Sequence, residues 1–238
     1  PEAVPDSGLA AAAVRDAGFR SFSVTPGLDF KTIFGFSPNS LQSLIAGRVA
    51  PGTIYAVESE MGSGKTEAAL YLGYRLLCEK KIDGIYFALP TQLTSEKIRD
   101  RVNSFLEKIL APGSPREALL VHGDAWLDWN LYEEGGDGGK HRKPDSWFYS
   151  AKRALLAPFA VGTVDQALLS VINVRHRDLR AFGLAGKLVV IDEVHSYNNY
   201  TGQLIRELTA RLRDWGATVV ILSATLTCAA RKELLQMS

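Results

Sequence analysis

The sequence predicts an α/β fold: a mostly parallel sheet with helices on both of its faces. Short apolar runs alternate along the chain with amphipathic stretches of helical period, which is typical of repeated strand, helix, strand units. The polar motifs follow directly after the apolar runs, where the carboxyl ends of parallel strands place their ligands. With 238 residues, of which 46% are hydrophobic, the chain is long enough for one large domain of this class.

Six apolar runs, each bounded by glycine, proline or a polar turn, are expected to be buried strands. Their near-continuous apolar character favours a parallel sheet that is covered on both sides. The expected strands are residues 53–58, 84–89, 118–122, 159–162, 187–191 and 217–222.

Three apolar stripes at helical spacing predict helices between these strands. They are formed by Ala68, Leu72 and Leu76, by Ile98, Val102, Phe105, Leu106 and Ile109, and by Leu204, Leu208 and Leu212. Lys97, Arg99 and Arg101 fall on the polar side of the second helix, where a solvated face and a nucleic-acid contact are both open alternatives.

The remaining segments set the limits of the domain. Residues 1–30 are expected to be a linker or arm, with a short helix near 10–17, and residues 31–238 the folded lobe. The glycine-rich and charged stretch 133–146 is predicted to be a surface insertion.

Composition narrows the class of protein. The net charge of +1 gives no general basic surface, so nucleic acid would have to be bound by local groups. No apolar run approaches the roughly 18 residues of a membrane span, and the two cysteines, Cys78 and Cys228, have no metal-ligand spacing. A cytoplasmic protein with free thiols and no membrane partner is expected.

The stretch SEMGSGKT, between the first strand and a helix, is predicted to bind the phosphates of a nucleotide. Gly62 and Gly64 allow a tight turn whose backbone N–H groups point at one place, and the helix N-terminus adds about half a positive charge there. Lys65 is expected to reach the β- and γ-phosphates, and the Thr66 hydroxyl to ligate Mg²⁺. Glu60, Met61 and Ser63 complete the predicted loop, although Ser59 stands where the strict pattern has its first glycine.

Two carboxylates and an imidazole follow the apolar run 187–191. An acidic pair at a strand end is typical of a metal site, an acid/base dyad or a helix N-cap. The phosphate loop favours the first, with Asp192 holding Mg²⁺ together with Thr66 and Glu193 orienting the attacking water. His195 has no further ligand at zinc spacing.

In order along the chain, SEMGSGKT, IDEVHSY and LSATL resemble motifs I, II and III of superfamily 2 helicases. The resemblance implies a RecA-like P-loop NTPase domain. It also implies that His195 communicates with the segment Ser223, Ala224 and Thr225, and so links the nucleotide state to movement between two lobes.

Further motifs narrow the resemblance to the first RecA-like lobe of the CRISPR-associated helicase-nuclease of type I systems. FGFSPNSLQ resembles its adenine-recognising segment, with Gln42 as the base-reading amide, and FALPTQLTSEKIRDRV and VGTVDQALL resemble motifs Ia and Ib. Nucleic-acid contacts are implied for Pro90, Thr91, Gln92, Thr163 and Gln166 at these strand ends. Arg175 belongs to the densest basic cluster, which suits either DNA or a partner.

The resemblance also implies partners. Single-stranded DNA, a second RecA-like lobe with an arginine finger, an HD nuclease domain and an RNA-guided surveillance complex are expected, because the chain stops soon after motif III and has no adjacent His-Asp pair. The expected function is ATP-dependent translocation on single-stranded DNA in CRISPR interference. A nucleotide-binding module without turnover, and a lobe of an RNA helicase or restriction translocase, are the alternatives.

Overall fold

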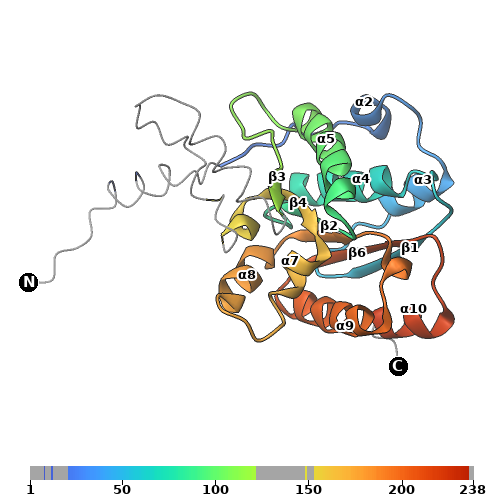
Figure 1. The fold of residues 1–238 in the computed structure, drawn as a ribbon. Coiled ribbons are helices and arrows are strands. Elements are labelled where there is room, and N and C mark those ends of the chain that lie inside the picture. Colours follow the sequence, from blue (N-terminus) through green and yellow to red (C-terminus); the bar gives the residue numbers. More distant parts are fainter. Residues whose placement is uncertain (1–7, 9–11, 13–20, 122–147, 149–152, 236–238) are drawn as a thin grey trace, which may run out of the picture.

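The computed structural model describes residues 21–121 and 153–235, together with positions 8, 12 and 148 (Figure 1). The expected helix near 10–17 and the insertion 133–146 lie outside the described part, apart from position 12. The helices in the described ranges are α2 (Phe30–Phe34), α3 (Ser40–Ala46), α4 (Lys65–Cys78), α5 (Gln92–Ile109), η2 (Ala154–Leu156), α7 (Val164–Leu168), α8 (Arg177–Leu184), η3 (Val194–Ser196), α9 (Asn199–Asp214) and α10 (Cys228–Leu234), where η marks a 3-10 helix.

Six strands form one sheet in which every pairing is parallel, in the order β1-β6-β5-β2-β4-β3. They are β1 (Ile54–Glu58), β2 (Ile85–Leu89), β3 (Leu119–Val121), β4 (Phe159–Thr163), β5 (Leu188–Ile191) and β6 (Thr218–Ser223). Each bound lies within one residue of the sequence prediction. The predicted fold class, a mostly parallel sheet with helices on both faces, is confirmed.

Two hydrophobic cores lie on the two faces of the sheet because successive strand residues point to opposite sides. In β2, Ile85, Phe87 and Leu89 pack in one core, and Tyr86 and Ala88 in the other. Helices α2 to α5 cover the first face and α7 to α10 the second (Figure 1). Both faces are therefore shielded, which explains why the strands read as continuous apolar runs.

Helix α4 is more deeply buried than its apolar stripe predicts. Eleven of its 14 residues are buried, because α3 and α5 pack on it from outside while the sheet lies beneath. The segment that precedes α2 is tied to the same layer: the Tyr74 hydroxyl accepts from Leu28 N (2.7 Å) and donates to Thr25 O (3.0 Å). Helix α4 thus fixes the phosphate loop at its N-terminus to the centre of the domain.

No helix in the described ranges is both long and apolar enough to cross a lipid bilayer.

Candidate nucleotide site

The loop between β1 and α4 has the backbone conformation of a phosphate-binding turn. Gly62 and Gly64 have φ angles of 78° and 82°, in the left-handed region where a side chain is strained. Helix α4 begins at Lys65 and runs for 14 residues, so its unpaired N-terminal N–H groups face the turn. An anion in this turn meets aligned backbone donors and the positive end of a helix dipole.

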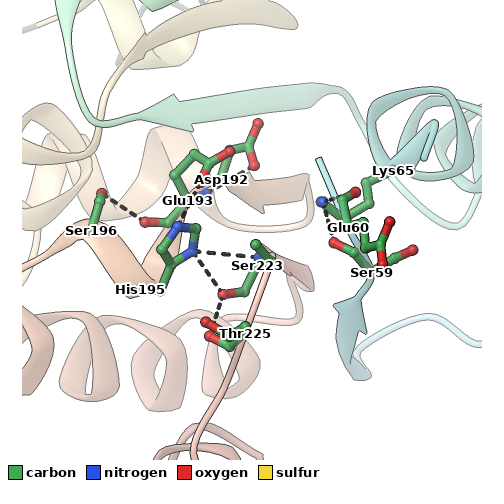
Figure 2. Close-up of polar contacts among 10 residues, drawn as sticks. Ser59, Glu60, Lys65, Asp192, Glu193, His195, Ser196, Ser223 and Thr225 are labelled. Atoms are coloured by element: carbon green, nitrogen blue, oxygen red, sulfur yellow. Dashed lines mark hydrogen bonds and ion pairs between the residues drawn. The ribbon is translucent and has the colours of Figure 1, made fainter. Parts of the chain in front are cut away.

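Lys65 and Thr66 are both buried at the start of α4. The Lys65 ammonium group donates to the carbonyl oxygens of Ser59 (2.5 Å) and Glu60 (2.8 Å), so it is held over the loop that precedes it (Figure 2). An ammonium group can donate three hydrogen bonds, and one donor remains for a phosphate oxygen.

Helix α3 supports the loop through two side chains. Asn39 Nδ2 donates to Ser63 O (2.9 Å), and Gln42 Nε2 donates to Gly64 O (3.2 Å). Gln42 Oε1 also accepts from Asn39 N (2.9 Å), which closes a capping box. Gln42 therefore positions the phosphate loop.

Asp192 and Glu193 follow β5. Asp192 is buried and accepts from the backbone N–H of Glu193 (2.8 Å). Burial raises the pKa of Asp192, while that hydrogen bond and the positive charges of Lys65 and Arg101 act in the opposite direction. Glu193 has a φ of 55°, in the left-handed region that non-glycine residues seldom adopt, and it lines the same cavity as Asp192.

His195, on η3, joins Glu193 to the end of β6 (Figure 2). Its Nε2 lies 3.1 Å from Glu193 Oε2, and because a carboxylate only accepts hydrogen bonds, this nitrogen donates. Its Nδ1 lies 3.0 Å from Ser223 Oγ, which in turn donates to Thr225 O (2.8 Å). Ala224 N approaches the same Nδ1 at 3.4 Å. The structure thus brings together the four residues that the sequence analysis linked.

The segment after β6 also contacts the end of β1, just before the phosphate loop, and the sequence analysis did not predict this connection. Glu58, the last residue of β1, accepts from Leu226 N (3.1 Å) and forms an ion pair with Arg231 of α10. These contacts hold the pKa of Glu58 below its usual range. No sequence motif signals Glu58, because its partners lie more than 160 residues along the chain.

A cavity of about 440 Å³ unites these elements. It brings together most of the predicted ATP-site residues with Asp192 and Glu193. Its lining consists of Phe36, Asn39, Gln42, Met61, Gly62, Ser63, Gly64, Lys65, Thr66, Glu67, Ile98, Arg101, Asp192 and Glu193. Glu60 is not part of the lining and takes part through its carbonyl oxygen.

Three residues of that lining, Glu67, Ile98 and Arg101, were not assigned to the nucleotide site from the sequence, and Phe36 and Asn39 lie in the segment FGFSPNSLQ, from which only Gln42 was singled out. The sequence predicts that Arg101 lies on the polar face of a helix, either in solvent or against nucleic acid. The structure places it at the nucleotide cavity. Helical periodicity could not reveal this, because it identifies the polar face without showing what lies opposite.

The nucleic-acid candidates lie at the ends of neighbouring strands. Pro90 and Thr91 lie between β2 and α5, which begins at Gln92, while Thr163 ends β4 and Gln166 lies in the short helix α7 that follows. Thr91 caps α5 by accepting from Thr94 N (3.3 Å), and Thr163 is buried. Arg175 is exposed before α8, and its carbonyl oxygen accepts from the buried Arg180 (3.0 Å). Thr91, Gln92 and Arg175 are exposed, whereas Pro90 and Gln166 are half-buried.

A phosphate loop beside an acidic pair at the carboxyl edge of a parallel sheet, with a histidine connecting that pair to a third strand, defines the nucleotide-binding lobe of a RecA-like helicase. The chain belongs to the DEAD/DEAH box helicase family, whose model matches residues 39–234.

Within this family, the chain is similar to CRISPR-associated Cas3 proteins. The CRISPR-associated endonuclease/helicase Cas3 of Thermus thermophilus is 39% identical over 96% of this chain and 26% of its own length. The crystal structure of T. fusca Cas3-AMPPNP has a TM-score of 0.79 at 34% identity, covering 94% of this chain and 25% of that one. A chain of a CRISPR RNA-guided surveillance complex in its pre-nicking state has a TM-score of 0.58 at 32% identity, covering 83% and 19%. This chain therefore spans about a quarter of the length of these relatives.

Proposed function

We propose that this chain is the ATP-binding lobe of an ATP-dependent helicase that translocates on single-stranded DNA in CRISPR interference. The observation that carries the proposal is the cavity in which the phosphate loop and the acidic pair meet, with His195 joining Glu193 of that cavity to Ser223. Similarity to Cas3 proteins, one of them solved as Cas3-AMPPNP, supports ATP as the nucleotide.

The residues of the cavity suit different parts of the reaction. Lys65 and the loop N–H groups would bind the phosphates, and Gln42 would read the base. Glu193, which accepts a hydrogen bond from His195, would orient the attacking water.

The donors present also fit a Mg²⁺ ion. The Thr66 hydroxyl and the Asp192 carboxylate are buried oxygen donors in one cavity, and Mg²⁺ prefers oxygen ligands. When bound, such an ion would neutralise charge on the phosphates. Within the described residues, no group of three or more His, Cys, Asp or Glu could hold a further metal.

The proposed partners follow from the relatives. A second RecA-like lobe and an HD nuclease domain, in the same parent chain or in another subunit, would complete the cytoplasmic enzyme, and an RNA-guided surveillance complex would recruit it. The surveillance-complex chain to which this lobe is similar supports that setting. In isolation the lobe is expected to bind nucleotide with little turnover, because the arginine finger that it would need is worth about 10³–10⁵ in rate.

The test is steady-state ATP hydrolysis with Mg²⁺, with and without single-stranded DNA or RNA, in a full-length protein that contains this lobe. We expect DNA-stimulated hydrolysis that is lost in both Lys65→Ala and Glu193→Gln, while only Lys65→Ala loses ATP binding. Equal loss of binding in the two variants would contradict the separate roles. Stimulation by RNA rather than DNA would point to a different helicase class.

A further inference from the structure

Arg101 approaches the nucleotide cavity from a different element than the phosphate loop. It lies on α5 (Gln92–Ile109), about three turns after the N-cap Thr91, and it lines the cavity together with Lys65 and Thr66. Its side chain is 48% exposed. Arg101 and Lys65 are the two cationic side chains among the lining residues.

In the described structure the guanidinium group is paired with Glu67. Glu67 stands in the first turn of α4, directly after Thr66, and its side chain is only 17% exposed. A Cβ atom on Gly64 would lie 3.6 Å from Glu67 Oε2, which places this carboxylate against the phosphate loop itself. The Arg101–Glu67 pair therefore forms part of the cavity wall beside the loop.

The charged side chains that line the cavity are more acidic than basic. The lining contains two cations, Lys65 and Arg101, and three carboxylates, Glu67, Asp192 and Glu193. A polyphosphate that enters such a cavity meets an excess of negative charge unless a cation turns towards it. Arginine suits this exchange, because its planar fork binds carboxylate and phosphate oxygens in the same bidentate manner.

We propose that Arg101 is a further nucleotide-binding residue, which Glu67 holds at the cavity wall and which exchanges this carboxylate for phosphate oxygens of the bound nucleotide. The proposal rests on nucleotide binding as the function of the cavity. It also gives α5 a direct contact with the nucleotide, while the first turn of the same helix carries the nucleic-acid candidates Thr91 and Gln92. A nucleotide in the cavity would then act on α5, the helix that carries these nucleic-acid candidates.

A binding experiment distinguishes the role of Arg101 from that of Glu67. Affinities for AMPPNP, ADP and adenosine are measured by calorimetry, with Mg²⁺ present, for the wild-type chain and for Arg101→Ala, Arg101→Lys, Glu67→Ala and Lys108→Ala. Lys108 is an exposed cation in the last turn of α5, outside the cavity, and serves as the charge control.

We expect Arg101→Ala to weaken AMPPNP and ADP about tenfold and to leave adenosine unchanged, and Arg101→Lys to recover part of the loss. Glu67→Ala should leave these affinities equal or tighter, because it removes the competitor for the guanidinium group, and Lys108→Ala should not change them. Both Arg101→Ala and Glu67→Ala break the same ion pair, so equal weakening in the two would show a structural role and overturn the proposal.

Further outcomes distinguish an error in the assignment of Arg101 from an absence of nucleotide binding. Wild-type binding of ADP with an unchanged affinity in Arg101→Ala would overturn the assignment of Arg101 alone, and an equal loss for adenosine would exclude a phosphate contact. A wild-type chain that binds none of the three ligands would overturn nucleotide binding by this lobe alone, and this inference with it.

Discussion

Lys187 is a charged residue buried at the start of β5, away from the nucleotide cavity. Its ammonium group donates to the carbonyl oxygens of Leu155 (2.7 Å) and Ala157 (2.5 Å), and so ties the segment before β4 to the sheet. Burial lowers the pKa of Lys187 to about 7, with Asp83 opposing the shift. The described contacts include no ion pair of this lysine with a carboxylate, so its charged form is costly in the folded state.

This burial predicts a pH dependence of stability. Between about pH 7 and 10.5 the unfolded chain keeps the Lys187 proton and the folded chain has lost it, so the free energy of unfolding rises with pH. Below pH 7 both states are protonated, and the full cost of the buried charge remains. The slope from one such group is at most about 1.4 kcal/mol per pH unit.

Lys187→Met removes the titrating group while keeping a side chain of similar length. Urea unfolding at pH 6, 7.5 and 9 should show the wild type gaining stability relative to the variant as the pH rises above 7. Parallel pH profiles for the two proteins would show that Lys187 keeps its ordinary pKa in the fold.

Single residues mark the limit of what the sequence could predict. Lys65, Asp192, Glu193 and His195 could be assigned because each belongs to a motif whose spacing has a chemical reason. Arg101 could not, because its role comes from the way that α5 packs beside α4 rather than from neighbouring residues in the chain.

At the scale of elements, the strands were predictable and their order was not. An apolar run bounded by turn residues identifies a strand by itself, which is why all six bounds agree within one residue. The order β1-β6-β5-β2-β4-β3 depends on how helices cross the sheet, and this information lies in tertiary contacts. The near-complete burial of α4 escaped prediction for the same reason.

Two helical glycines illustrate how packing decides the effect of one methyl group. A Cβ on Gly183 of α8 would lie 2.7 Å from the backbone carbonyl of Leu155, which cannot move aside as a side chain can. A Cβ on Gly202 of α9 would meet nothing within 4 Å.

We therefore expect Gly183→Ala to destabilise the chain by about 1–3 kcal/mol through overpacking. Gly202→Ala should stabilise it by about 0.5–1 kcal/mol, because alanine restricts the unfolded chain and favours the helix. Chemical denaturation of both variants beside the wild type tests this contrast. A stabilised Gly183→Ala would show that α8 and the segment near Leu155 are not packed as described.

At the scale of the whole molecule, the two cores hold the strands of the sheet in place. The residues at the carboxyl ends of these strands form the site. Lys65 and Thr66 come from α4 and Asp192 from the end of β5, and the sheet holds them together before any ligand binds. A site formed in advance by a folded lobe should bind nucleotide even where the parts required for turnover are absent.

This separation of binding from turnover can be measured by thermal unfolding. A ligand at 100 times its Kd stabilises the folded state by about 2.7 kcal/mol, which corresponds to a rise in Tm of about 5–10 °C for a domain of this size. We expect this rise with Mg²⁺ and ATP for the isolated chain and for Glu193→Gln, and its absence for Lys65→Ala. The Tm of Lys65→Ala without nucleotide is the control for folding. If nucleotide left the wild-type Tm unchanged at concentrations that support hydrolysis in the full-length protein, the lobe alone would lack a preformed site, and a second lobe would have to complete nucleotide binding as well as turnover.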